Sequence, residues 1–139
     1  EKLFDAIKDK FEITRVKDRI TNPVDGYRDI LINVKLANGT IGELQIQPSK
    51  ISILKNSEHV QYQIARKILE KAPKNSKGDI ILSSSDRMKL KSATDNMNTK
   101  YGLAWKEQLK INPNFMEEYS GLAKRLDTYS KRLDQKGKL

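Results

Sequence analysis

Two alternating segments on either side of an Asn-Gly pair constrain the fold of this chain most strongly. Successive side chains of a β-strand point to opposite faces, so apolar residues at every second position predict a strand with one buried face. Such residues occupy alternate positions of both segments, namely Ile30, Ile32, Val34 and Leu36 in the first and Leu44 and Ile46 in the second. The pattern therefore predicts an antiparallel hairpin over residues 30–47.

The position of one acid, Glu43, predicts the register of this hairpin. A two-residue turn at Asn38-Gly39 would place Glu43 on the apolar face with Ile32 and Val34, because a shift of one residue turns every side chain over. The pattern therefore favours an odd-length loop or a bulge at Gly39 over the tight turn that Asn-Gly usually forms. In that register the face opposite the core carries Leu31, Asn33, Lys35, Glu43, Gln45 and Gln47.

This polar face has two interpretations. Antiparallel sheets commonly leave one face in solvent, which is the simpler reading. Glutamate is depleted in strands, however, and the Glu-x-Gln-x-Gln pattern of residues 43–47 favours the lining of a binding cleft. The loop before the first strand, residues 21–26, is flanked by basic residues that could hold phosphates or simply be solvated: Lys17, Arg19 and Arg28.

A series of short motifs between Phe11 and Lys67 carries a family resemblance. In chain order they are Lys17-Asp18, Pro23, Gly26-Tyr27-Arg28-Asp29-Ile30, Asn38-Gly39, Glu43-Leu44-Gln45-Ile46 and His59-x-x-Tyr62. Together they resemble the synthetase domain of RelA/SpoT-type alarmone synthetases, which has a nucleotidyltransferase fold. The resemblance implies transfer of pyrophosphate from ATP, with Mg²⁺, to a hydroxyl of GDP or GTP. In related toxins the acceptor is an adenine nucleotide or the 3′ end of tRNA.

The resemblance also implies roles for individual residues. Glu43 would lie at the magnesium ion and the acceptor hydroxyl, Tyr27 would stack on the acceptor base, and Lys17 would contact phosphates. His59 and Tyr62 would support the site from the following helix. We add His59 as a candidate general base, because only histidine has an ordinary pKa near neutrality, although a lone helical histidine is more often structural. The candidate phosphate-binding and nucleotide-binding residues are Lys17, Arg19, Tyr27, Arg28, Gln45 and Tyr62.

The chain departs from the family pattern at several positions. Leu31 stands where the family has histidine, and Gln47-Pro48 stands where it has an arginine-threonine pair. The family's ATP-binding basic residues and first metal-binding aspartate are expected upstream of Glu1, so the chain is expected to be the second half of such a domain. A catalytically inactive module that binds RNA, the ribosome or a protein is therefore the alternative function.

The divergent motifs and a basic helical tail favour a toxin-like member of the family. Such a domain is expected to be part of a longer, secreted bacterial protein that acts in the cytoplasm of a target cell, with a dedicated immunity protein as partner. Residues 1–70 have a formal charge of +2 and residues 71–139 one of +7. A basic half can attract nucleic acid or nucleotides, or can simply confer solubility. The chain has no cysteine, which excludes a disulfide framework and a thiolate metal site, and no apolar run of membrane-spanning length.

The remaining pattern predicts an α+β fold, with a small antiparallel or mixed sheet and helices packed on its apolar face. Helices are expected over residues 2–10, from Ser57, after Ser83–Ser85 and after Pro113, and short strands over residues 11–16 and 80–82. The expected buried side chains of the helices are Val60, Ile64 and Ile68, then Leu90, Ala93, Met97, Tyr101 and Ala104, then Phe115, Tyr119, Leu122, Leu126 and Leu133. Residues 1–82 are expected to form the synthetase half-domain, and residues 83–139 a helical extension of the same globular unit.

Overall fold

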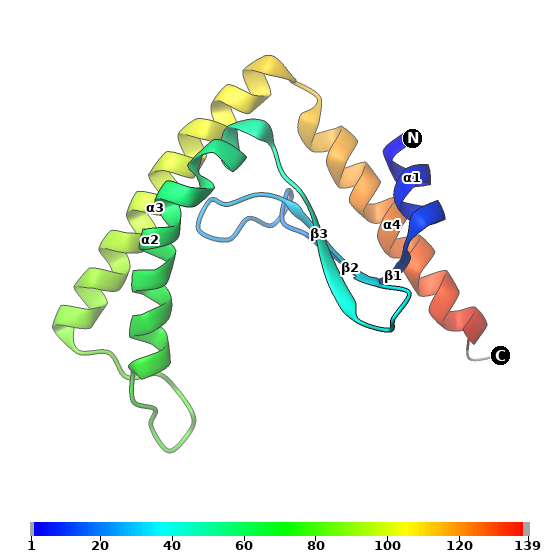
Figure 1. Ribbon diagram of the computed structural model, residues 1–139. Helices are drawn as coiled ribbons and strands as arrows, with labels where there is room; N and C mark the ends of the chain where they lie inside the picture. Colours follow the sequence, from blue (N-terminus) through cyan, green and yellow to red (C-terminus); the bar gives the residue numbers. More distant parts are fainter. Residues whose placement is uncertain (1, 138–139) are drawn as a thin grey trace. The chain divides into compact units, whose positions relative to one another are not determined.

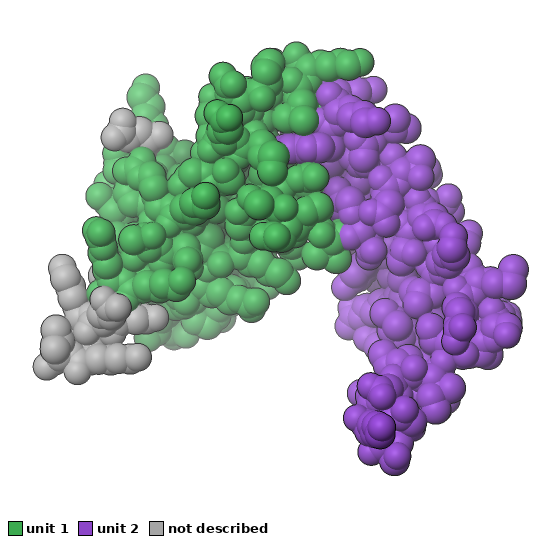
Figure 2. Space-filling model, turned by 180° about the vertical axis from the view of Figure 1, so that it is seen from behind, with its two compact units in different colours: residues 1–24, 28–48, 108–139 green, residues 25–27, 49–107 purple. Residues whose placement is uncertain are grey.

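The computed structural model describes the backbone of residues 2–137 and the side chains of residues 2–132. They form an α+β structure, with four helices and a three-stranded antiparallel sheet in the described range, which confirms the coarse fold class (Figure 1). Two compact units divide the chain (Figure 2). Unit 1 comprises residues 1–24, 28–48 and 108–139, and unit 2 comprises residues 25–27 and 49–107.

The sheet of unit 1 contains β1 (Glu12–Asp18), β2 (Ile30–Lys35) and β3 (Ile41–Ile46), in that spatial order. Asn33 pairs with Glu43, so positions of equal parity face each other across the hairpin. The connection closes with a hydrogen bond of 2.8 Å from the Leu36 amide to the Thr40 carbonyl, and Gly39 has a φ of 85°. The predicted odd-length loop with a special conformation at Gly39 is therefore confirmed.

The core of unit 1 lies on the apolar face of this sheet. Ile30, Ile32 and Val34 are almost completely buried there. The helix α4 (Phe115–Gly137) packs against β1, and α1 (Lys2–Lys10) packs against α4 (Figure 1). Leu126 of α4 is fully buried, and the Ser130 hydroxyl donates a hydrogen bond of 3.1 Å to the Ile13 carbonyl of β1.

The apolar stripe of α4 matches the prediction in part. Phe115 and Leu126 are buried, whereas Tyr119 and Leu122 are half-buried. Leu133, the last residue of the predicted stripe, lies outside the described side chains. Because this stripe packs against β1, α4 belongs to the unit that holds the sheet, and the observed division differs from the predicted boundary at residue 82.

Unit 2 is built mainly from α2 (Ser49–Lys71) and α3 (Ser84–Ile111), whose last residues lie in unit 1. The predicted start of α2 at Ser57 is wrong, because the helix begins directly after Pro48. The predicted buried stripe is also wrong, since Val60 is 60% exposed and Ile64 39% exposed. The buried residues of α2 repeat every seven positions instead: Ile51, Glu58 and Ala65.

The pattern of α3 is closer to the prediction. Ala93, Met97, Tyr101 and Ala104 are all buried. The Ser83 hydroxyl accepts a hydrogen bond of 3.1 Å from the Asp86 amide, so Ser83 caps the start of the helix as expected.

The segment between α2 and α3 is not the predicted strand. Residues 80–82 contribute a single isolated bridge, between Lys74 and Ile80. The Asn75 side chain accepts hydrogen bonds of 2.9 Å from the amides of Lys77 and Asp79. This Asn-centred turn reverses the chain so tightly that no regular ladder follows. None of the helices in the described part of the chain has the length and apolar character needed to cross a membrane.

Candidate functional site: the polar face of the sheet

Opposite the core, the sheet of unit 1 presents a polar face arranged in rows across its strands. One row contains Lys17, Leu31 and Gln45, and the next contains Arg15, Asn33 and Glu43. A bulge at Thr14 in β1 keeps Arg15 on this face although Ile13 points into the core. The register therefore places the basic residues of β1 and the glutamate of β3 on the same side, as the sequence predicted for Glu43 and Gln45.

One corner of the polar face is occupied by a charged pair. The Arg19 guanidinium donates two hydrogen bonds to the Asp29 carboxylate, at 2.5 and 2.7 Å, and the Gln45 amide donates a third, at 3.1 Å. The Asp29 side chain is completely buried and the Arg19 side chain largely so. Because the charge of Arg19 is balanced by Asp29, this corner adds little net positive charge to the polar face. The pair instead stabilises the structure of the sheet at this corner.

The open part of the face is charged and accessible. Glu43, Lys17 and Arg15 are all exposed, and Leu31 and Asn33 of β2 lie half-buried between them. Neighbouring strands lie about 4.8 Å apart, so about 10 Å separates the backbones of β1 and β3. A ligand lying over β2 would therefore have cations on one side and a carboxylate on the other.

Arg28 holds the loop that precedes β2. Its guanidinium donates a hydrogen bond to the Ile20 carbonyl, and burial lowers its pKa below the usual value. The Asp18 carboxylate accepts hydrogen bonds from the amides of Ile20 and Thr21 in the same loop. The polar side chains at the end of β1 therefore shape the loop whose flanking basic residues were candidates for holding phosphates or for being solvated.

Tyr27 belongs to unit 2, where its ring meets the ring of Tyr101 edge to face at a centroid distance of 5.6 Å. The turn before it uses two left-handed residues, Asp25 with a φ of 49° and Gly26 with a φ of 82°. A Cβ added at Gly26 would lie only 3.2 Å from the Asn98 Cα of α3. Glycine at this position thus allows the Tyr27 segment to lie directly against α3.

This close approach predicts a measurable cost for Gly26→Ala. The substitution adds left-handed strain of about 1 kcal/mol or more and a clash with the backbone of α3. The matched control is Gly78→Ala, because Gly78 has a φ of 83° and no atom within 4 Å of the added Cβ. Urea unfolding is expected to show a loss of about 1 kcal/mol for the control and about 2–3 kcal/mol for Gly26→Ala. Equal losses would show that the turn does not need its contact with α3.

His59 and Tyr62 are exposed residues of α2 in unit 2. Their rings stack at a centroid distance of 6.0 Å, and the His59 Nε2 lies 3.0 Å from the Gln63 side-chain nitrogen. Arg66 on the same side of the helix pairs with Glu70 at 2.7 Å. The predicted His-x-x-Tyr pair therefore exists as a pair of neighbouring rings on the surface of a helix.

The predicted site residues thus fall into two groups. Unit 1 holds Lys17, Arg19, Arg28, Glu43 and Gln45, and unit 2 holds Tyr27, His59 and Tyr62. Within unit 1 the register brings Lys17, Glu43 and Gln45 onto one face, whereas Arg28 is anchored in the adjacent loop. Within unit 2 the motif brings His59 beside Tyr62, and Tyr27 packs on Tyr101 instead.

The donor groups of the described residues do not form a resident metal site. Among the described residues, no group of three histidine, cysteine, aspartate or glutamate side chains is close enough to hold a metal ion. Of the carboxylates on the polar face, Asp29 is already bound by Arg19, and Glu12 and Glu43 lie on β1 and β3, which are separated by β2. The protein residues described here thus do not fit a magnesium ion that is held by the chain alone.

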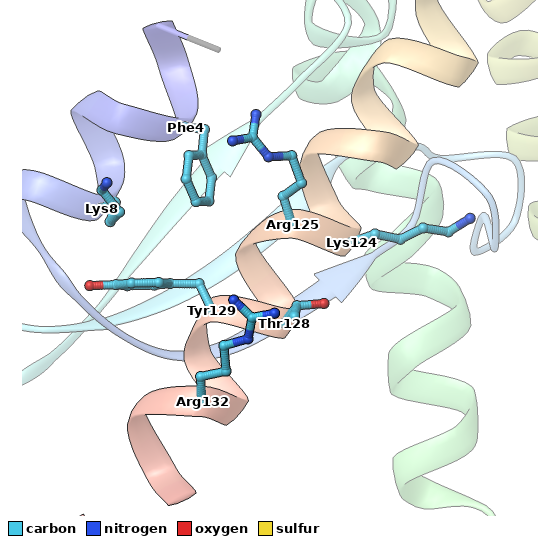
Figure 3. A pocket seen from close by; sticks show the side chains of 7 residues that line it. All are labelled: Phe4, Lys8, Lys124, Arg125, Thr128, Tyr129 and Arg132. Atoms are coloured by element: carbon cyan, nitrogen blue, oxygen red, sulfur yellow. The ribbon is translucent and has the colours of Figure 1, made fainter. Parts of the chain in front are cut away.

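Two features with functional potential were missed by the sequence analysis. One is a cavity of about 490 Å³ between α1 and α4, lined by basic and aromatic residues (Figure 3). The sequence does contain a pattern that indicates this cavity, because basic and aromatic residues such as Arg125 and Tyr129 are spaced four positions apart. The other is the buried carboxylate of Glu58, which lies in the middle of a helix that otherwise reads as amphipathic.

Comparison with known proteins adds no relative. No protein-family model matches the sequence, and no curated protein and no solved structure shows significant similarity to it.

Proposed function

We propose that the chain is a RelA/SpoT-like, toxin-like domain that transfers pyrophosphate from ATP to a hydroxyl of a nucleotide or of the tRNA 3′ end. The observation that supports this proposal is the register of the sheet, which aligns Glu43 with the basic residues of β1 on one polar face. That combination suits phosphoryl-group transfer, because such reactions depend mainly on positioning and on neutralising the charge of the phosphates.

Three exposed residues of the open face, Lys17, Arg15 and Glu43, have roles in this proposal. Lys17 and Arg15 neutralise phosphate oxygens from the β1 side. Glu43 accepts the proton of the acceptor hydroxyl from the β3 side as that oxygen attacks the β-phosphorus of ATP, and AMP leaves. Asp29 and Arg19 hold the end of the sheet in register, so they position the face without contacting substrate. Magnesium would neutralise further phosphate charge when it arrives with ATP.

Labelled ATP tests this proposal directly. The chain is incubated with ATP labelled at the β-phosphate and with GDP, AMP or tRNA in separate reactions. Transfer of label to one acceptor is expected, with a loss of at least about 100-fold in Glu43→Gln. The matched control is Glu12→Gln, an exposed strand glutamate opposite Lys35, which is expected to retain activity.

The toxin part of the proposal is tested by expressing the chain in bacteria. Growth arrest is expected for the parent sequence and for Glu12→Gln, and normal growth for Glu43→Gln. Absence of label on every acceptor, together with growth arrest that Glu43→Gln does not relieve, would contradict the proposed reaction.

A second candidate function is a non-catalytic module that binds RNA, the ribosome or a protein. The specific observation that favours it is the Arg19–Asp29 pair, which uses one of the cations expected to clamp phosphates. The uncharged Leu31 in the centre of the polar face also favours binding without chemistry. Ligand binding that persists without ATP and is unchanged in Glu43→Gln would support this alternative.

A further inference from the structure

The cavity between α1 and α4 is lined by four cations and two aromatic rings. Its residues are Phe4, Lys8, Lys124, Arg125, Thr128, Tyr129 and Arg132, all from unit 1 (Figure 3). None of these lining residues is acidic, so the cavity carries a formal charge of +4. Its volume of about 490 Å³ lies within the range of sites for small molecules, which is roughly 300–1,000 Å³.

The spacing of residues on the two helices explains this concentration. Phe4 and Lys8 lie one turn apart on α1. On α4, Lys124, Thr128 and Arg132 follow one another at intervals of four, and Arg125 and Tyr129 form a parallel row beside them. Residues four apart lie on the same face of a helix, so each row follows one side of α4, and Figure 3 shows the Lys124 side chain extending away from the Tyr129 ring.

The aromatic rings form the floor of the cavity and hold its cations in place. Phe4 is nearly buried, and Tyr129 meets it edge to face at 6.2 Å. The Arg125 guanidinium lies over the Phe4 ring at 4.1 Å, and the Lys8 ammonium at 5.6 Å. The cation–π contact fixes the position of the Arg125 charge without neutralising it, whereas the Lys8 ammonium also pairs with Asp5 at 3.7 Å and with Asp9 at 4.0 Å. Figure 3 shows Tyr129 between Phe4 and Arg132.

We infer that this cavity binds single-stranded RNA, with a base against the Tyr129 ring and the flanking phosphates on Lys124, Arg125 and Arg132. Single strands are held by a positively charged groove and by aromatic rings that stack on bases, and both elements are present here. An acidic peptide would use the cations but would leave the aromatic floor without a partner. The inference does not depend on the proposed reaction, because the cavity is distinct from the polar face of the sheet.

A salt titration with a charge-matched control tests the inference. The probe is a short fluorescein-labelled RNA of mixed sequence, and its affinity for the whole chain is measured by fluorescence anisotropy without ATP. The test variant combines Lys124→Gln, Arg125→Gln and Arg132→Gln. The control variant combines Lys106→Gln, Lys110→Gln and Lys131→Gln, which removes the same charge from exposed positions outside the cavity.

The test variant is expected to bind at least about ten-fold more weakly, and the slope of log affinity against log salt is expected to fall by about 2. Each phosphate contact to a single strand contributes about 0.7 to that slope, and three contacts are removed. The control variant is expected to lose much less affinity. Equal losses in the two variants would overturn the inference, because diffuse positive charge would then account for the binding.

Tyr129 provides an independent readout. Tyr129→Leu keeps an apolar side chain against Phe4 but removes the stacking ring, so affinity is expected to fall about five-fold or more with an unchanged salt slope. Tyr129→Phe keeps the ring and is expected to bind like the parent. Stronger binding of poly-glutamate or of phosphatidylserine vesicles than of RNA would overturn the choice of ligand. Glu43→Gln is expected to leave RNA binding intact, which separates this inference from the proposed catalysis.

Discussion

Replacing Asp29 by alanine is expected to lower the free energy of unfolding by about 3–5 kcal/mol. The substitution leaves the Arg19 guanidinium, whose side chain is only 17% exposed, without the carboxylate that accepts two of its hydrogen bonds. It also removes the acceptor of the Gln45 amide. The loss of two charge-assisted hydrogen bonds in a largely buried position accounts for most of this cost, and urea unfolding followed by circular dichroism measures it.

The control for this prediction is an exposed aspartate with an equally short ion pair. Asp127 lies 2.9 Å from Lys131 on α4, and its side chain is 41% exposed. Asp127→Ala is expected to cost no more than about 1 kcal/mol. The double variant Asp29→Leu with Arg19→Met is expected to recover much of the stability lost in Asp29→Ala. If the two single aspartate variants are equally stable, burial does not govern the strength of the Arg19–Asp29 pair.

Replacing Glu58 by methionine is expected to have the opposite sign and to stabilise the chain by about 1–3 kcal/mol, which is the usual cost of a buried acceptor without a hydrogen bond. Glu58 is 1% exposed, and neither of its carboxylate oxygens accepts a hydrogen bond, although the Lys100 ammonium lies 2.9 Å from one of them. That ammonium is itself half exposed, so its attraction is screened by water. Methionine fills a similar volume without the cost of desolvating a charge.

The neighbouring Tyr101 reports on the same substitution. Burial raises the pKa of the Tyr101 phenol, and the charge of Glu58 raises it further. The stabilising effect of this shift is present below about pH 10 and is lost as the pH rises through the pKa of the folded state. Glu58→Met is expected to lower the pKa of Tyr101, which ultraviolet difference titration measures.

An exposed glutamate on the same helix is the control. Glu70 pairs with Arg66 at 2.7 Å on the surface of α2, and Glu70→Met is expected to change stability by no more than about 0.5 kcal/mol. A loss of stability in Glu58→Met would show that the carboxylate is better solvated in the folded chain than its burial indicates. Stability unchanged within error in both variants would contradict the predicted cost of burying Glu58.

Features that depend on local residue pattern could be predicted from the sequence, whereas features that depend on tertiary contacts could not. The register of the hairpin could be predicted because the parity of Glu43 relative to Ile32 and Val34 allows only one arrangement with an apolar core. The pairing of Arg19 with Asp29 could not be predicted, because the two residues lie ten positions apart on either side of a loop and their contact depends on tertiary position.

The errors in α2 have a similar origin. The buried residues of α2 repeat every seven positions, namely Ile51, Glu58 and Ala65, and one of them is a carboxylate. Because a glutamate is not expected in a buried stripe, the apolar Val60 and Ile64 were assigned to the core instead. The cavity between α1 and α4 was missed because its two helices lie at opposite ends of the sequence and meet only through packing. Sequence pattern therefore predicted the faces of each strand better than the partners of each helix.

The hydrogen bond between Ser130 and Ile13 spans 117 residues, so unit 1 cannot close until α4 has been synthesised. On the ribosome, β1 to β3 emerge early and keep the face of Ile30 and Ile32 uncovered while α2 and α3 are translated. While unit 1 is incompletely folded, its apolar surface is exposed and can associate with other nascent chains. The hairpin is therefore the part of unit 1 whose apolar face stays uncovered until α4 is available to pack on it.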